Sequence, residues 1–447
     1  MPEVNRRGLL IGAAAFTAAG LLPGTAAAAT RRGPATARPA LTAGDRAVLD
    51  RLDVRRALEH LRVLSDDIGW RVAGTPADRR AARYIAGELR DFGYQVELRS
   101  YPVEDRNLAE VRAKGEPLWQ CGASLQGTVE SMAGTVVDVG PVTEIDTDVR
   151  GVPVLFDRLR GKETEQVRAA ADAGASAVVF VNTRWPDEPE IKAGTFPPEL
   201  KESFDFPVLG LAEYHGERIR AGARHLSFEV SRLVGASSYN VVAERKGTDP
   251  NGRAVIVSGH YDSVPGSPGG NDDGSGTVLS MEVARALQPL RTPQTVRVCL
   301  WGAEELGDIG SQQYVKQLDD AAAARISGCF QNDMSATSHP DAGTYWLLSV
   351  DGADNTTTAA VGAAARRLGY GGHIKGPVAR GSSDHESFHE RGIAAGNFSW
   401  RGPEAPSQLE PVYHTPEDTI AGNISPERLK MSLEMIGCAA YDVASRP

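Results

Sequence analysis

The second half of the chain repeats one unit, a short apolar strand followed by a loop and then a helical segment. We expect strands at residues 253–263, 295–305, 326–335 and 394–400, and helices at 274–290, 310–325, 355–370 and 425–445. This alternation predicts an α/β domain with a mixed, mainly parallel sheet flanked by helices, because parallel strands need helical crossovers. Ligands of such sheets bind beyond the carboxyl ends of the strands.

The first half is organised differently. Residues 45–98 are mostly helical by pattern, with apolar residues at three- and four-residue steps as far as Gly93, and residues 95–103 alternate like a strand. Residues 111–235 contain short apolar runs broken by Gly and Pro, with one expected helix at 162–175. A chain of 447 residues with 41% hydrophobic content is long enough for more than one domain. We therefore predict a small β-rich domain at 111–235.

The N-terminus has the pattern of a signal peptide. Arg6 and Arg7 precede an apolar stretch that ends in small residues near Ala29, as in twin-arginine signals. We expect residues 1–29 to be removed and 30–44 to be flexible, although an uncleaved membrane anchor is the alternative. No later segment has the roughly 18 apolar residues needed to cross a bilayer. Export to a secreted, periplasmic or cell-surface location follows, with no stable membrane insertion after cleavage.

Charge and cysteine content argue against a nucleic-acid-binding protein and against a cysteine-based metal or redox site. The net charge is −10 and the body has no long basic stretch, so nucleic acid is not an expected partner. The four cysteines are far apart and form no C-x-x-C pair, which argues against a zinc ribbon or a thioredoxin-type site. Buried thiols are the simpler interpretation, and one or two disulfides remain the alternative in an exported protein. The four are Cys121, Cys299, Cys329 and Cys438.

Polar side chains gather at the carboxyl ends of the expected strands, and five of them are potential metal ligands. The polar residues are His260, Asp262 and Asp272 at the first, Glu304 and Glu305 at the second, Asp333 at the third, and Tyr413 and His414 in a loop before the last helix. Imidazole and carboxylate together favour zinc, cobalt or manganese over calcium, which prefers oxygen ligands alone. Two histidines with three carboxylates exceed the ligand set of one catalytic zinc. They fit two zinc ions that share a carboxylate.

Each piece also has a simpler explanation. Asp272 and Asp273 could cap the following helix, and Glu304 and Glu305 could open one, since carboxylates are favoured in a first turn. A rival zinc motif, H-E-x-x-H, occurs at residues 385–389, where Glu386 would be the base. The third histidine of the longer form of that motif is absent, because Ala395 stands there.

The ordered set of motifs resembles peptidase family M28, the co-catalytic dizinc exopeptidases. The matching pieces are GHYDSVPGSPGGNDDGSG (259–276), WGAEELGDIGSQQYV (301–315), NDM (332–334) and YHTPEDT (413–419), and residues 71–97 and 239–247 also fit the family. The resemblance implies a zinc-exopeptidase fold at residues 45–110 and 236–447. It further implies an inserted protease-associated domain at 111–235.

The resemblance also implies a role for each site residue. One zinc would be held by His260 and Asp333 and the other by Glu305 and His414, with Asp272 bridging the two ions. Asp262 would orient His260, Glu304 would be the general base, and Tyr413 would donate to the oxyanion. The Asp272–Asp273 peptide bond would be cis.

The resulting hypothesis is an exported aminopeptidase that hydrolyses the N-terminal bond of peptides with a water activated by two zinc ions. A dizinc carboxypeptidase of the same family is the main alternative. A non-catalytic receptor-like module and a one-zinc glutaminyl cyclase are less favoured, because the base and the ligand set are complete. The sequence carries no feature that sets the residue specificity or the oligomeric state.

Overall fold

The computed structural model describes residues 40–447, and the predicted signal peptide lies outside this range. The described part forms two eight-stranded sheets. Helix α1 (Ala43–Leu49) begins two residues inside the segment predicted to be flexible. Thr42 caps this helix, because its hydroxyl accepts from the amide of Asp45 while the Asp45 carboxylate accepts from the amide of Thr42.

The first sheet is mixed, with a parallel centre. Strands β12, β11, β13 and β16 run parallel to one another, while β10 is antiparallel to its neighbours and β14 is antiparallel to β16. The spatial order is β1 (Gln95–Pro102), β10 (Ser237–Arg245), β12 (Thr295–Trp301), β11 (Ala254–His260), β13 (Ile326–Gln331), β16 (Ala395–Arg401), β14 (Thr344–Ser349) and β15 (Ile374–Ala379).

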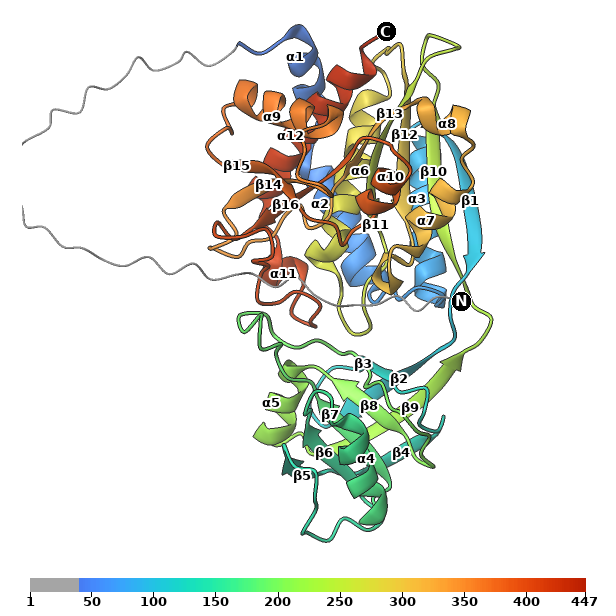
Figure 1. The fold of residues 1–447 in the computed structure, drawn as a ribbon, viewed down its shortest axis with the longest axis vertical. Coiled ribbons are helices and arrows are strands. Elements are labelled where there is room, and N and C mark those ends of the chain that lie inside the picture. The colour runs from blue at the N-terminus through green and yellow to red at the C-terminus, as the bar shows by residue number, and fades with distance from the viewer. Residues whose placement is uncertain (1–39) are drawn as a thin grey trace, which may run out of the picture. The chain divides into compact units, whose positions relative to one another are not determined.

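Helices cover both faces of this sheet (Figure 1). The larger face packs against α2 (Val54–Arg62), α3 (Pro76–Asp91), α6 (Gly276–Leu287), α9 (Thr356–Leu368) and α12 (Pro426–Ala444). The other face packs against α7 (Ile309–Lys316), α8 (Asp320–Ala324) and α10 (His385–Glu390). Shorter turns connect them, namely η1 (Val63–Ile68), η2 (Gly270–Ser275), η3 (Glu304–Leu306) and α11 (Ile420–Asn423).

Side-chain alternation along the central strands builds two cores. Val255 and Val257 point into the larger core with the long helices, whereas Ile256 points into the smaller one. Successive residues of a strand face opposite sides, so a strand covered on both faces is apolar throughout. This explains why every residue of β11 is buried. The central strands are therefore held rigidly, and so are the loops that begin at their carboxyl ends.

The second sheet is inserted between β1 and β10 (Figure 1). Its strands in spatial order are β4 (Ser131–Thr135), β9 (His225–Leu233), β2 (Arg106–Ala113), β3 (Trp119–Ala123), β8 (Val208–Leu211), β7 (Ala177–Val181), β6 (Pro153–Asp157) and β5 (Val137–Gly140). It starts at Arg106, five residues before the predicted boundary of 111. It also has two helices, α4 (Glu163–Asp172) and α5 (Glu213–Ala221), where we expected one.

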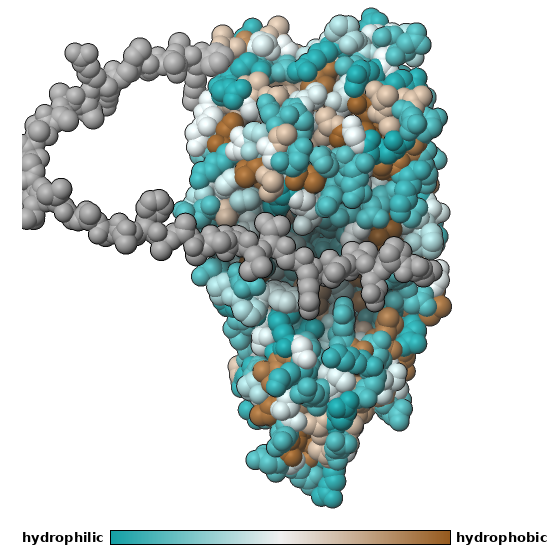
Figure 2. All heavy atoms as spheres, viewed as in Figure 1, coloured by the Kyte–Doolittle hydropathy of each residue, from teal (hydrophilic) through white to brown (hydrophobic). Residues whose placement is uncertain are grey.

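None of the helices within residues 40–447 is long and apolar enough to cross a bilayer. On the face drawn in Figure 2, hydrophobic residues are scattered among polar ones.

All four cysteines are buried and none forms a disulfide. Burial of this kind keeps a thiol protonated, and it raises the pKa of Cys121 to about 12.

Candidate metal centre

The predicted ligands converge at the carboxyl ends of three adjacent parallel strands. His260 is the last residue of β11, Glu304 and Glu305 lie in η3 just after β12, and Asp333 follows β13 by two residues. Because β12, β11 and β13 are neighbours with the same direction, these loops start side by side. The convergence inferred from the strand pattern is present in the fold.

Asp272 lies between the two histidines. Its Oδ1 is 3.2 Å from Nε2 of His260, and its Oδ2 is 2.9 Å from Nε2 of His414. The peptide bond that follows Asp272 is cis, as the resemblance implied. One carboxylate therefore reaches both imidazoles, each through a different oxygen.

A carboxylate accompanies each histidine. Asp333 Oδ1 lies 3.8 Å from Nε2 of His260, and Glu305 Oε2 lies 3.1 Å from Nε2 of His414. Glu304 Oε2 is also near His260, at 3.7 Å from Nε2. Two three-residue groups have ligand atoms within 4.8 Å of one another, namely His260, Glu304 and Asp333, and His260, Asp272 and Glu305.

The centre contains buried oxygen atoms without hydrogen-bond partners. These atoms are Oε1 of Glu305 and Oδ1 of Asp333. A buried carboxylate oxygen without a donor is expensive unless a cation satisfies it. Two imidazole nitrogens and three carboxylates are suitable zinc ligands. The residues therefore fit a pair of divalent ions.

Close packing of these groups shifts their proton affinities. Burial alone would lower the pKa of His414, but the charges of Glu305 and Asp272 outweigh it and raise the pKa to about 10. Burial raises the pKa of Glu305 to about 7 and the pKa of Glu304 well above its usual range. Protons therefore compete with a metal ion for His414 and Glu305 near neutral pH.

Asp262 has a second contact that the sequence did not suggest. Its Oδ1 accepts the backbone amide of Glu304 at 3.1 Å, and its Oδ2 accepts that of Glu305 at 3.3 Å. The same Oδ1 is 3.5 Å from Nδ1 of His260, which has no hydrogen bond. Asp262 therefore holds the η3 turn in place as well as lying behind His260.

Two other carboxylates fix the backbone around the ligands. Asp273 accepts the amides of His260, Gly276 and Met334, which joins β11, α6 and the loop after β13. Asp418 accepts the amides of Asn271 and Asp272. Asp418 lies within the YHTPEDT motif, so the motif contains the signal, but local sequence does not reveal which backbone it binds.

Tyr413 stacks on His414. The ring centroids are 3.6 Å apart and the rings are inclined by 21°. Burial, followed by the charges of Asp272 and Glu305, raises the pKa of Tyr413 well above its usual range. The phenol therefore stays protonated and can donate a hydrogen bond next to the carboxylate cluster.

A cavity of about 590 Å³ opens beside Glu305. The first sheet and its loops contribute Val72, Ala73, Leu306 and Ile309, and the inserted sheet and its loops contribute Leu108, Leu125, Phe196 and Leu200. Apolar walls next to a cluster of charged ligands are typical of a site that binds an organic substrate. Both parts of the chain line this cavity.

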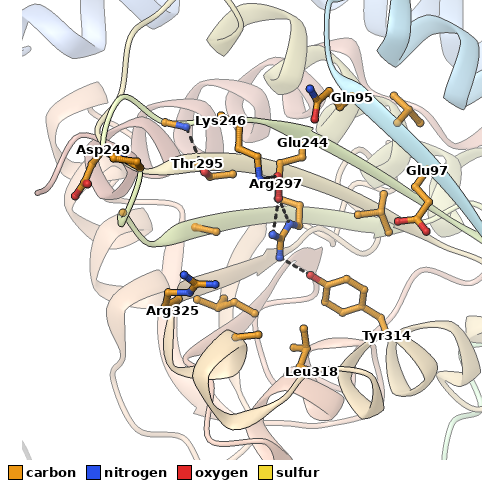
Figure 3. Close-up of a pocket in the computed structure, with 18 of the residues that line it drawn as sticks. Gln95, Glu97, Glu244, Lys246, Asp249, Thr295, Arg297, Tyr314, Leu318 and Arg325 are labelled. Carbon is orange, nitrogen blue, oxygen red and sulfur yellow. Dashed lines mark hydrogen bonds and ion pairs between the residues drawn. The ribbon is translucent and has the colours of Figure 1, made fainter.

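A larger cavity of about 750 Å³ lies elsewhere, over β1, β10 and β12 (Figure 3). Arg297 crosses it, donating to Oε2 of Glu244 at 3.0 Å from Nε and to the hydroxyl of Tyr314 at 2.6 Å. The charged side chains that line this cavity are largely paired with one another, and none of the predicted metal ligands is among its lining residues. Its size alone does not make it the functional site.

The rival H-E-x-x-H motif does not form a metal site. His385 is buried with its Nε2 2.8 Å from the carbonyl oxygen of Arg380, whereas His389 is exposed. Glu386 accepts the amide of Ser382. The two histidines of α10 therefore do not converge, and neither belongs to a candidate metal group within residues 40–447.

Comparison with known proteins places this centre in a family. The model of peptidase family M28 matches residues 240–439, which contain every predicted ligand. The aminopeptidase YwaD of Bacillus subtilis strain 168 is 31% identical over 397 residues, covering 88% of this chain and 85% of that protein. The chain belongs to peptidase family M28. The prediction of the family, made from the motifs, is confirmed.

Two other comparisons extend the match. A probable lipoprotein aminopeptidase of Mycobacterium tuberculosis, LpqL, is 28% identical over 433 residues, covering 87% of this chain and 83% of that protein. The solved structure of a zinc aminopeptidase from Bacillus subtilis has a TM-score of 0.67 at 30% identity, covering 89% of this chain and 96% of that one. The predictions of a mixed α/β fold and of a metal-dependent peptidase are confirmed as well.

Proposed function

We propose that this M28 peptidase is an exported aminopeptidase that uses two zinc ions. The observation that carries the proposal is the position of Asp272, whose two oxygens reach His260 and His414 separately. The names of the relatives, aminopeptidases of which one is a zinc enzyme, support an aminopeptidase over a carboxypeptidase. The substrate would be the N-terminus of a peptide or protein.

His260 and Asp333 would hold one zinc ion, Glu305 and His414 the other, and Asp272 both. This division is the one that the family resemblance implies, and the distances are compatible with it, since Glu305 lies beside His414 and Asp333 lies near His260. When bound, the two ions lower the pKa of a water molecule and polarise the scissile carbonyl. Glu304 is then free of a ligand role, although it lies close to His260.

Glu304 would act as the general base and then as the general acid. Its side chain is partly buried, and it projects from a turn whose backbone amides are held by Asp262. It takes a proton from the attacking water and returns it to the leaving amine. The Tyr413 hydroxyl donates a hydrogen bond to the oxyanion as the carbonyl becomes tetrahedral. The cavity beside Glu305 has room for the adjoining side chains of the peptide.

We also propose the identity of the remaining segments. The sheet inserted between β1 and β10 would be a protease-associated domain, as the resemblance implies. The Arg6–Arg7 pattern supports export by the twin-arginine route, and one relative is named a lipoprotein. The mature enzyme would be secreted, periplasmic or attached at the cell surface.

Paired substrates test the reaction. An unblocked dipeptide should be hydrolysed, its N-acetylated form should not, and a chelator should stop turnover until zinc is restored. Cleavage of the acetylated peptide from its C-terminus would overturn the aminopeptidase assignment.

A matched pair of variants tests the catalytic base. Glu304→Gln should lower kcat by a factor of about 10² to 10⁴, which is the usual contribution of a general base. Glu386→Gln, the same change in the rival motif, should leave most of the activity. The reverse pattern would place the chemistry on α10 instead.

A further inference from the structure

A short segment of the inserted region lies against the loop that carries His414. We call residues 191–198, between β7 and β8, the strap. The amide of Lys192 donates to the carbonyl of Pro411 at 2.8 Å, and its Nζ forms an ion pair with Oε2 of Glu417 at 2.6 Å. Thr195, fully buried, donates from its hydroxyl to the carbonyl of Pro265. The strap therefore contacts loops on both sides of the metal centre.

Gly194 brings the strap closest to the ligand. A Cβ atom built at this position would lie 2.2 Å from the carbonyl oxygen of His414, closer than any real contact. His414 itself has a φ of 59°, a left-handed conformation that non-glycine residues rarely adopt without external restraint. The backbone of Gly194 packs directly against this unusual residue and leaves its carbonyl no room on that side.

The strap is fixed from within the inserted region. Asn182, buried just after β7, donates from Nδ2 to the carbonyls of Gly194 and Phe196, both at 2.8 Å. Arg158 donates in turn to Oδ1 of Asn182 at 3.1 Å. A buried amide that satisfies two carbonyls of one segment sets the position of that segment.

The strap also reaches the imidazole. The ring centroid of Phe196 lies 5.5 Å from that of His414, with the planes inclined by 58°. Tyr413 stacks on the same imidazole at 3.6 Å. The ring of His414 is therefore restrained by aromatic contacts from two different segments, and its backbone is restrained by Gly194.

We infer that the strap positions His414, so that binding of the Glu305–His414 zinc ion depends on the inserted region. This inference rests on the proposed function, which supplies the zinc ions. Within residues 40–447, neither His260 nor Asp333, which would hold the other zinc ion, has a hydrogen bond, ion pair or ring contact with the strap, although Thr195 contacts the loop that follows His260. The strap should therefore affect one ion selectively, whereas a general loss of stability would affect both.

The test is a zinc titration of the metal-free protein against a chromogenic chelator. Gly194→Ala and Asn182→Ala should each weaken one of two binding steps by about 10- to 100-fold, the usual effect of residues that orient a ligand, and leave the other unchanged. His414→Ala is the reference for the step that is lost. Gly343→Ala is the control, because a Cβ there would meet no atom within 4 Å. Cobalt absorption should show the same selective loss.

The outcomes separate the inference from the proposed function. Unfolding midpoints establish that each variant folds. If Gly194→Ala does not fold, the zinc titration of Asn182→Ala tests the inference in its place. If the folded variant binds both ions as tightly as the parent chain, or loses both equally, the inference is overturned. If the parent chain itself takes up only one zinc ion, or is active without zinc, then the proposed function fails instead.

Discussion

The substitution Asp262→Asn tests how the structure aims the catalytic turn. The Asp262 side chain is fully buried, and its two oxygens accept the amides of Glu304 and Glu305 at 3.1 and 3.3 Å. Asparagine has nearly the same shape but only one oxygen that can accept. Its NH₂ group would face the second amide, donor against donor, so one buried N–H would lose its partner.

The size of the effect follows from that lost partner. A buried amide left without an acceptor costs about 1–3 kcal/mol. The metal-free Asp262→Asn variant should therefore have a free energy of unfolding that is lower than that of the parent chain by about that amount. If the cost falls on the orientation of Glu304, turnover should decrease by about 10- to 100-fold, since 1.36 kcal/mol corresponds to a factor of ten.

The assay combines denaturant unfolding of the metal-free protein with the hydrolysis of an unblocked dipeptide by the zinc-loaded protein. Unfolding is measured without metal because a bound ion adds its own stabilisation. Asp91→Asn removes the same charge at an exposed position at the end of α3 and serves as the control. A change below about 0.5 kcal/mol in unfolding and below about twofold in turnover, within the usual range for surface substitutions, would refute this role of Asp262.

Three further predictions concern protons and the oxyanion. Zinc affinity should fall as pH decreases from 8 to 6, because protons occupy Glu305, with a pKa of about 7, and His414, with a pKa of about 10; a chelator titration that gives one affinity at all pH values would contradict this. Burial lowers the pKa of His215 to about 3, so its contribution to stability is complete above pH 6.5 and is lost as pH falls toward 3. His215→Gln should flatten the decline of the free energy of unfolding between pH 6.5 and 3, by up to about 1.4 kcal/mol per pH unit, and an unchanged slope would count against it. Tyr413→Phe should bind both zinc ions normally and lower kcat by about 10² to 10³, and equal losses of metal and activity would indicate a structural role instead.

Strand patterns predicted the centre of the fold well and its edge poorly. The runs that became β11, β12 and β13 are mostly apolar because both faces of the sheet are covered by helices. The sequence analysis did not predict β14 or β15. Strand β15 contains Gly376 and Pro377, residues that disfavour strands and are tolerated at a sheet edge, which is where it lies.

The residues of the candidate site also differ in how far their positions could be predicted from the sequence. His260, Glu304, Glu305 and Asp333 follow predicted strands, so their proximity could be inferred from the parallel sheet alone. His414 is different, because it lies in a loop far along the chain and does not follow one of the parallel strands that bring the others together. Its place depends on the strap, which packs against its carbonyl, and on Asp418 of the same loop, which ties that loop to the backbone amide of Asp272.

The sequence by itself determined the type of chemistry, since the residue types at the strand ends already favour a pair of divalent ions. It also determined the fold class, because hydrophobic periodicity is a local property of the chain. Only the tertiary structure decided which carboxylates lack hydrogen-bond partners, that Asp262 holds η3, and that Gly194 of the inserted sheet lies against His414. These features depend on distances between segments that are remote in sequence, and such distances are set by packing of the whole chain.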